Sequence, residues 1–157
     1  MFTGEGGAVR DLSIIFSGEP FSKLSGKGRE FFREHVKIIS SRKGKRLIKE
    51  GDKGDTVYFL LEGCCGVLLD TPKGKLPVAH LYPPDFFGEL AVLDEFVSGM
   101  KRTATVENLT DIAAAAMKAA DFKELCAAET DVIGSIDKLY RKRRGELDEI
   151  RERIKNI

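Results

Sequence analysis

Short apolar runs separated by turn residues extend from Lys37 to about Met117, and this rhythm constrains the fold more than any other feature of the chain. The runs are strand-like in length and include Val57–Leu61, Val67–Leu69 and Pro77–Leu81. Glycine, proline and aspartate are concentrated between them. Several short strands joined by frequent turns are typical of an antiparallel sandwich or barrel, so we predict a mainly β domain.

The last run of this region, Ile112–Met117, carries conflicting signals. Its four consecutive alanines favour a helix by intrinsic propensity. Its position, between a strand and the turn at Asp121, favours a closing strand. We give the position more weight than the propensity and predict a strand.

Helical periodicity flanks the strands on both sides. Residues 28–38 carry Phe31, Phe32 and Val36 at roughly helical spacing, which predicts an amphipathic helix before the first strand. From Asp121 the pattern is helical to the end of the chain. We therefore expect a helix on the N-terminal side of the β domain and a long helix on its C-terminal side.

The C-terminal helix carries a second pattern, a heptad seam with alternating spacings of three and four residues. Seven of the eight seam positions are apolar or aromatic, and charged residues flank them. The seam consists of Ile133, Ile136, Tyr140, Arg143, Leu147, Ile150, Ile154 and Ile157. We predict a coiled coil, and a single amphipathic helix packed on its own domain is the alternative.

Length, charge and cysteine content exclude several classes of protein. A chain of 157 residues is long enough for one domain with a buried core. Its formal net charge of +1 predicts no general attraction to nucleic acid or to membrane surfaces. No apolar run approaches the length of a membrane span, and the N-terminus lacks the apolar core of a signal peptide. Cys64, Cys65 and Cys126 form no CxxC pair, so we expect no metal site and free thiols in a reducing cytoplasm.

Two segments that follow the strand-like run Pro77–Leu81 together contain groups that bind a sugar and a phosphate. Phe86–Ala91 supplies a carboxylate, Glu89, and small or apolar residues with free backbone N–H groups. Arg102–Val106 begins with an arginine. A carboxylate accepts from a sugar hydroxyl, while N–H groups and a guanidinium hold an anion. The two segments therefore predict a site for a ligand that carries both a hydroxyl and a charged phosphate.

A glycine-punctuated segment, residues 44–63, precedes this pair of segments. Gly51 and Gly54 permit tight turns at φ > 0. Asp52 and Asp55 have side chains that bond nearby backbone N–H groups and hold such turns. Taken alone, the segment indicates a generic hairpin.

Together, these segments resemble the cyclic nucleotide-binding domain family, which includes catabolite activator-type regulators, regulatory subunits of cyclic-nucleotide-dependent kinases and cyclic-nucleotide-gated channels. The resemblance covers about residues 20–140. It implies a β-roll of jelly-roll type with an N-terminal helix and a long C-terminal helix. We accordingly expect an N-terminal segment at 1–20, a cyclic nucleotide-binding roll at 21–120, and C-terminal helices with the seam at 121–157.

The resemblance also implies roles for single residues. Glu89 would accept from the ribose 2′-hydroxyl, Arg102 would pair with the cyclic phosphate, and Thr103 would lie beside the phosphate and the purine edge. The backbone of Gly88 and Ala91 would face the sugar and phosphate. The expected ligand-binding residues are Val67, Leu69, Gly88, Glu89, Leu90, Ala91, Arg102 and Thr103.

The base and the residue that caps it stay open. Val67 and Leu69, on one face of their strand, look like the apolar wall under the base. Thr103 resembles the choice in cGMP-dependent kinases and in channels, whereas the wider use of cAMP in the family favours cAMP. Tyr140 and Arg141 are both candidates for the base cap. We expect cAMP or cGMP as the ligand, and no cofactor.

By resemblance, the chain is a non-catalytic regulatory module whose C-terminal helices transmit ligand binding. Its partner would be a second copy of the chain, in a homodimer through the C-terminal helix, or an effector domain. One alternative is a metal-dependent enzyme on a similar roll. Such an enzyme needs clustered histidine and carboxylate metal ligands. The two histidines, His35 and His80, lie far apart in sequence. The other alternative is a degenerate roll that binds nothing and serves as a coiled-coil interaction domain.

Overall fold

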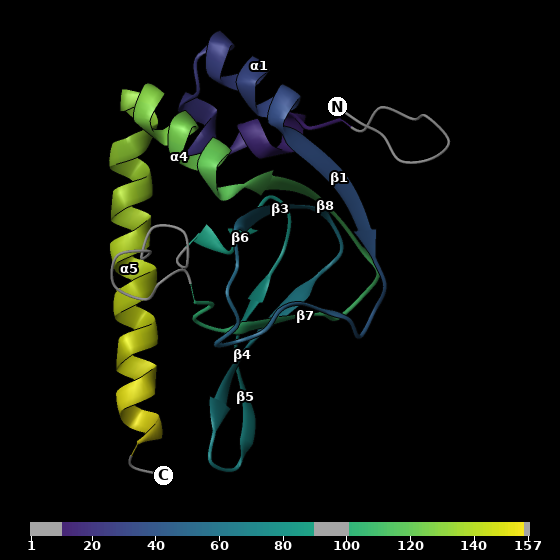
Figure 1. Ribbon diagram of the computed structural model, residues 1–157, viewed down its shortest axis with the longest axis vertical. Coiled ribbons are helices and arrows are strands. Elements are labelled where there is room, and N and C mark those ends of the chain that lie inside the picture. The colour runs from purple at the N-terminus through teal and green to yellow at the C-terminus, as the bar shows by residue number, and fades with distance from the viewer. Residues whose placement is uncertain (1–10, 90–100, 156–157) are drawn as a thin grey trace.

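The computed structural model describes residues 11–89 and 101–155 of the 157-residue chain (Figure 1). Within these residues, eight strands form two four-stranded antiparallel sheets, one in the order β1-β8-β3-β6 and the other in the order β2-β7-β4-β5. The strands are β1 (Val36–Ser41), β2 (Arg46–Ile48), β3 (Thr56–Glu62), β4 (Cys65–Thr71), β5 (Gly74–Leu81), β6 (Phe86–Phe87), β7 (Thr105–Asn108) and β8 (Ile112–Lys118).

Helices flank this roll at both ends of the chain. Two short 3₁₀ helices, η1 (Ser13–Ser17) and η2 (Phe21–Lys23), lead into α1 (Gly26–His35). After β8 come α4 (Ala119–Ala128) and the long α5 (Thr130–Ile154). Figure 1 shows α1 and α4 together at one end of the roll, while α5 runs along its side past β6 and beyond β4. The predicted fold class, a mainly β roll with an N-terminal helix and a long C-terminal helix, is confirmed.

The first sheet has an apolar core on each of its faces, because successive side chains of a strand point to opposite faces. On β3, Val57, Phe59 and Leu61 belong to the core shared with the helices. Leu60, between them, belongs to the core inside the roll. This double burial explains why the run from 57 to 61 is continuously apolar rather than alternating.

The closing strand β8 confirms the prediction made for its alanine run. It lies between β1 and β3 and pairs with both of them. Ala113, Ala115 and Met117 contribute to the helix-side core, and Ile112 and Ala114 to the core inside the roll. Strand pairing on both edges and burial on both faces outweigh the intrinsic preference of alanine for helix.

The N-terminal helix differs from its predicted bounds at both ends. The predicted helix at 28–38 is α1, but it ends at His35, and Val36 opens β1 opposite Met117. From Val36 onward the chain pairs with the closing strand β8, although the spacing of apolar residues alone predicted that the helix would continue to residue 38. At the other end, the Ser25 side chain caps the helix by accepting from the Gly28 N–H at 3.0 Å.

Two glycines, Gly51 and Gly54, were predicted to form turns with positive φ, and only Gly51 has a positive φ. Gly51 has a φ of 87°, as expected for a tight turn. The prediction for Gly54 is wrong, because its φ lies outside the left-handed region. A Cβ built on Gly54 would instead lie 1.8 Å from Nε of Arg102. Gly54 therefore serves the close approach of a side chain.

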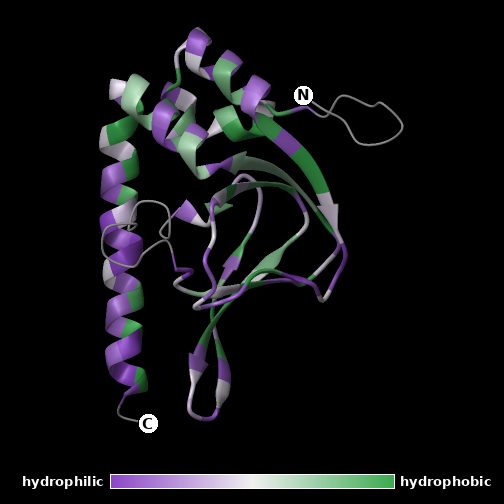
Figure 2. Cartoon of the chain, in the orientation of Figure 1, coloured by the Kyte–Doolittle hydropathy of each residue, from purple (hydrophilic) through white to green (hydrophobic). Residues whose placement is uncertain are grey.

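Helix α5 presents an apolar stripe to the roll. In Figure 2 the apolar positions in its lower half lie on the side that faces the strands. Val132 and Ile136, near its start, are buried in the core that the helices share with the first sheet. In the part of the chain that the structure describes, no helix is both long and apolar enough to cross a membrane.

Candidate functional site

A cavity of about 200 Å³ lies between the roll and α5. An ordered water needs about 10–15 Å³ by the same kind of measure, so this space is large enough for an organic ligand. Most of its lining is apolar: Ile48, Val67, Val78, Ala79, Leu81, Phe86, Phe87, Ala104, Val106, Leu147 and Ile150. Charged and polar groups also line it, contributed by Glu89, Arg102, Thr103, Arg143 and Glu146. A mainly apolar cavity with a few charged groups is typical of a small-molecule site.

Arg102 is buried, with only 7% of its surface exposed. Its guanidinium donates from Nη1 to the carbonyl of Gly88 at 3.1 Å and from Nη2 to the carbonyl of Thr56 at 3.0 Å. Burial lowers the pKa of Arg102, and the nearby Tyr58, Asp55 and Glu89 oppose that shift. An arginine starts from so high a pKa that it stays charged at neutral pH, so the site holds a fixed cation.

The backbone of Arg102 is tied to the turn that contains Gly51. The Arg102 N–H donates to the carbonyl of Asp52 at 2.7 Å, and the Gly51 N–H donates to the carbonyl of Arg102 at 2.8 Å. Lys53 and Lys101 form an isolated β-bridge beside them. The glycine-punctuated segment and the arginine segment, far apart in sequence, therefore form one structural unit at the cavity.

Glu89 is the most deeply buried carboxylate at the cavity, with 3% of its surface exposed. Its Oε2 accepts a close hydrogen bond from Nη1 of Arg143 on α5. The same Nη1 donates to the carbonyl of Phe86 at 2.9 Å. The Arg143 guanidinium also lies over the Phe86 ring, 4.7 Å from its centroid. A buried charge needs such a partner, because desolvation penalises an unpaired carboxylate.

Gly88 allows its own backbone to pack closely against Arg102 and Thr56. Its φ is 92°, a conformation that side chains with a Cβ rarely adopt. A Cβ at this position would lie 2.7 Å from the carbonyl oxygen of Thr56 and 2.9 Å from Nη1 of Arg102. Both the backbone conformation and the lack of space therefore require glycine here.

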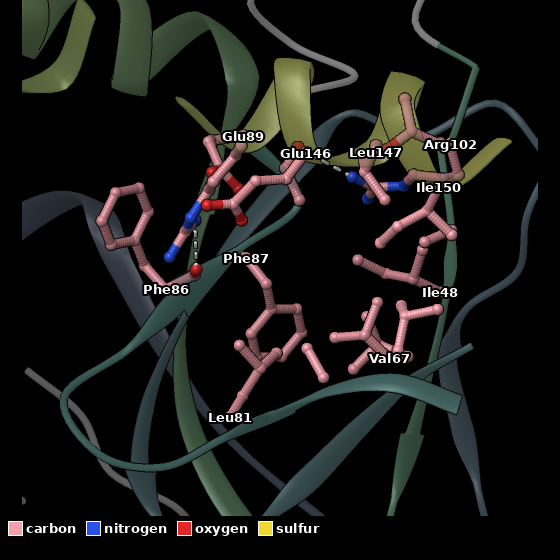
Figure 3. Close-up of a pocket in the computed structure, with 17 residues that line it drawn as sticks. Ile48, Val67, Leu81, Phe86, Phe87, Glu89, Arg102, Glu146, Leu147 and Ile150 are labelled. Atoms are coloured by element: carbon pink, nitrogen blue, oxygen red, sulfur yellow. Dashed lines mark hydrogen bonds and ion pairs between the residues drawn. The ribbon is translucent and has the colours of Figure 1, made fainter. Parts of the chain in front are cut away.

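Figure 3 shows how the apolar part of the cavity is built from opposite sides. Leu147 and Ile150 point from α5 toward Ile48 and Val67, which belong to β2 and β4. Arg151, the next residue on α5, donates to the carbonyl of Thr103 and pairs with Glu50 at 3.3 Å. Helix α5 is thus fastened to the roll at two points, with the apolar contacts between them.

The structure brings most of the predicted binding residues to this one cavity. Val67, Gly88, Glu89, Arg102 and Thr103 all line it. Leu69 is fully buried in the second sheet and is not part of the lining. Leu90 and Ala91 lie outside the described residues.

The contribution of α5 was missed at the level of single residues. Tyr140 and Arg141, the two candidates for the base cap, do not line the cavity, whereas Arg143, Leu147 and Ile150 do. These three belong to the heptad seam, and Arg143 is the one seam member that is neither apolar nor aromatic. A charged residue at an otherwise apolar position was the available signal that this part of the seam faces a polar group.

Side chains suited to metal binding are dispersed over the described part of the chain. Among residues 11–89 and 101–155, no three His, Cys, Asp or Glu side chains gather closely enough to hold a metal ion.

Comparison with known proteins relates this chain to a family. A family model described as "Cyclic nucleotide-binding domain" matches residues 38–129. A cAMP-dependent protein kinase regulatory subunit from Debaryomyces hansenii is 32% identical over 129 residues, which cover 82% of this chain and 26% of that protein. A cyclic nucleotide-gated potassium channel from Mesorhizobium japonicum is 29% identical over 143 residues, which cover 89% of this chain and 37% of the channel. The chain thus spans well under half the length of these curated relatives.

Solved structures share the fold. The regulatory domain of Toxoplasma gondii PKA, crystallised with cAMP, matches with a TM-score of 0.71 and 23% identity over 85% of this chain and 48% of that one. The catabolite activator protein of Thermus thermophilus matches with a TM-score of 0.70 and 22% identity over 88% of this chain and 61% of that one. The family model covers more than half of the residues and the fold agrees with it, so this chain belongs to the cyclic nucleotide-binding domain family.

Proposed function

We propose that this chain is a regulatory module that binds cAMP or cGMP and transmits binding through its C-terminal helices. The observation that carries the proposal is one cavity lined by a buried carboxylate, Glu89, a buried guanidinium, Arg102, and an apolar wall. A cyclic nucleotide carries the matching groups, namely a ribose hydroxyl, an anionic phosphate and an aromatic base. Solved relatives bound to cAMP support this choice of ligand.

In this proposal, Arg102 pairs with the cyclic phosphate. A guanidinium has five N–H donors, and the bonds to the carbonyls of Gly88 and Thr56 use two of them. Among the described residues no other bond to this guanidinium is present, so its remaining donors can bind an anion that enters the cavity. Glu89 accepts from the ribose 2′-hydroxyl, and the backbone of Gly88 lies beside the sugar and phosphate. The apolar side chains that face α5 enclose the base.

Transmission follows from the position of α5 as one wall of the cavity. Leu147 and Ile150 line the cavity together with residues of the roll, so a bound base contacts both. A ligand shifts an equilibrium between two helix positions only as far as its affinities for the two differ. A ligand that contacts α5 only when the helix is docked binds the docked form more tightly. It therefore shifts the equilibrium toward the docked position.

Calorimetric titration of the wild type and of Arg102→Ala with cAMP and with cGMP tests the binding proposal. A hydrogen bond to a charged group contributes about 1.5–3 kcal/mol, so we expect the variant to bind about 10- to 100-fold more weakly. Arg153→Ala serves as the control, because this exposed arginine pairs with Glu149 on the outer face of α5. Equal affinity of Arg102→Ala and the wild type would contradict the proposed phosphate site.

The same titration separates the alternatives that the sequence left open. Heat of binding with one nucleotide and none with the other decides between cAMP and cGMP. Thr103 favours cGMP, whereas the wider use of cAMP in the family favours cAMP. No heat with either, at protein concentrations well above micromolar, favours a degenerate roll that binds nothing. The relatives named above are a kinase regulatory subunit and a gated potassium channel, which supports a module that is not an enzyme.

The homodimer through the C-terminal helix, or an effector domain in its place, is part of the proposal. So is a cytoplasmic location, which rests on three free cysteines, two of them buried. Light scattering of the purified chain with and without nucleotide tests the dimer directly. A single monomer mass at all concentrations, in both conditions, would leave an effector domain as the partner.

A further inference from the structure

One ion pair joins the ligand cavity to the helix that covers it. Glu89 is buried in the wall of the cavity, and Arg143 reaches it from the middle of α5. Arg143 is held in place by two further contacts, its bond to the carbonyl of Phe86 at 2.9 Å and its stacking over the Phe86 ring. The carboxylate to which the proposed function assigns the ribose is therefore already oriented by α5.

The geometry allows Glu89 to bind the arginine and a hydroxyl at the same time. Arg143 occupies Oε2, and none of the described residues donates to Oε1. A carboxylate offers about four lone-pair sites on its two oxygens, so one guanidinium does not exhaust it. A carboxylate paired with a guanidinium also makes charge-assisted hydrogen bonds, which are stronger than neutral ones.

We propose that Arg143 is a positioning residue that orients Glu89 for the ribose 2′-hydroxyl, so that docking of α5 and recognition of the ribose depend on the same ion pair. This inference rests on the proposed function and adds the residue that couples the helix to the sugar. Docked α5 supplies the guanidinium that turns the carboxylate toward the cavity. A bound ribose in turn favours the helix position in which Arg143 reaches Glu89.

Arg151 provides a matched control within the same helix. It also docks α5, through Glu50 and the carbonyl of Thr103, but it does not contact Glu89. Loss of Arg151 therefore weakens docking alone. Loss of Arg143 weakens docking and also releases the carboxylate.

The test is a titration of wild type, Arg143→Met and Arg151→Met with a cyclic nucleotide and with its 2′-deoxy analogue. Methionine keeps much of the length of arginine and removes its charge and donors. For Arg143→Met we expect about a tenfold larger loss of affinity for the ribose ligand than for the deoxy ligand, the size of one charged hydrogen bond. For Arg151→Met we expect equal losses for both ligands.

Each outcome separates this inference from the proposed function. Equal losses for both ligands in Arg143→Met, with a wild type that binds, would overturn the positioning role and leave the binding function intact. Tighter binding by Arg143→Met would show that the arginine competes with the ribose, which also overturns it. A wild type that binds neither nucleotide removes the proposed function and this inference with it.

Two additional experiments sharpen the test, the first of which also serves if Arg143→Met folds poorly. Arg143→Lys retains a cation opposite Glu89, and we expect it to recover part of the preference for the ribose ligand. In a Glu89→Gln background the ionised carboxylate is already lost, so Arg143→Met should no longer change the ratio between the two ligands. An unchanged effect of Arg143→Met in that background would contradict action through Glu89.

Discussion

Replacement of Gly54 by alanine is expected to displace the side chain of Arg102 while Arg102 itself is not mutated. A Cβ at position 54 would lie 1.8 Å from Nε, 2.2 Å from Cζ and 2.5 Å from Nη2 of Arg102. The backbone of Gly54 is outside the left-handed region, so alanine adopts it without strain. The guanidinium must therefore move, and it cannot keep its bonds to the carbonyls of Gly88 and Thr56.

The size of the effect follows from these two bonds. Each hydrogen bond to a charged group contributes about 1.5–3 kcal/mol, while alanine in place of glycine returns about 0.4–1 kcal/mol by restricting the unfolded chain. We expect Gly54→Ala to lower the free energy of unfolding by about 2–5 kcal/mol. In the proposed function the phosphate also loses its cation, so nucleotide affinity should fall about 10- to 100-fold.

Urea denaturation and calorimetric titration of four proteins check this reasoning: wild type, Gly54→Ala, Arg102→Ala and the double variant. With Arg102 removed, the new Cβ meets no guanidinium, so Gly54→Ala should be close to neutral in that background. Gly26→Ala is the control for the substitution itself, because a Cβ there would meet nothing within 4 Å. Equal destabilisation by Gly54→Ala with and without Arg102 would refute the argument.

Further predictions concern the cores and the buried polar groups. Phe59→Ala removes a fully buried ring that contacts four other phenylalanines, and chemical denaturation should show a loss of about 3–5 kcal/mol. Asn108→Ala deprives Ser41 and the carbonyl of Arg42 of a buried donor, and the same measurement should show a loss of about 1–3 kcal/mol. Burial raises the pKa of the Cys65 thiol from 9.0 to about 11. The unfolded chain then loses its proton first as pH rises, so stability should decline between pH 9 and about 11, and Cys65→Ala should flatten that decline.

Three of the strands were predictable because their signals are local. Apolar runs and turn residues marked β3, β4 and β5 within the sequence. The alanine run of β8 was predictable only from its position, since its propensity pointed to a helix. The roll needs small side chains there, because Ala114 and Ala115 are fully buried on opposite faces of a strand that is paired on both edges.

The candidate site likewise contains residues that local motifs predicted and one that they did not. Gly88, Glu89, Arg102 and Thr103 lie in two short motifs, and the structure brings these motifs to one cavity. The role of Gly54 was not predictable, because no sequence pattern shows that the side chain of a residue 48 positions later will cross it. Long-range contacts of this kind arise from the topology of the roll, which places the two turns side by side.

The heptad seam was ambiguous for a physical reason, since the same spacing serves a partner helix and a sheet. Ile136 lies in the domain core, and Arg143, Leu147 and Ile150 line the cavity, so half of the seam faces the chain's own roll. A side chain buried against the roll is not available to a second helix. Pairing of two chains along this seam therefore requires α5 to leave the cavity, whereas a bound nucleotide, in the proposed function, holds it there. A dimer through the whole seam and a ligand enclosed by α5 therefore exclude one another, and a dimer of the liganded form must use positions that do not face the roll.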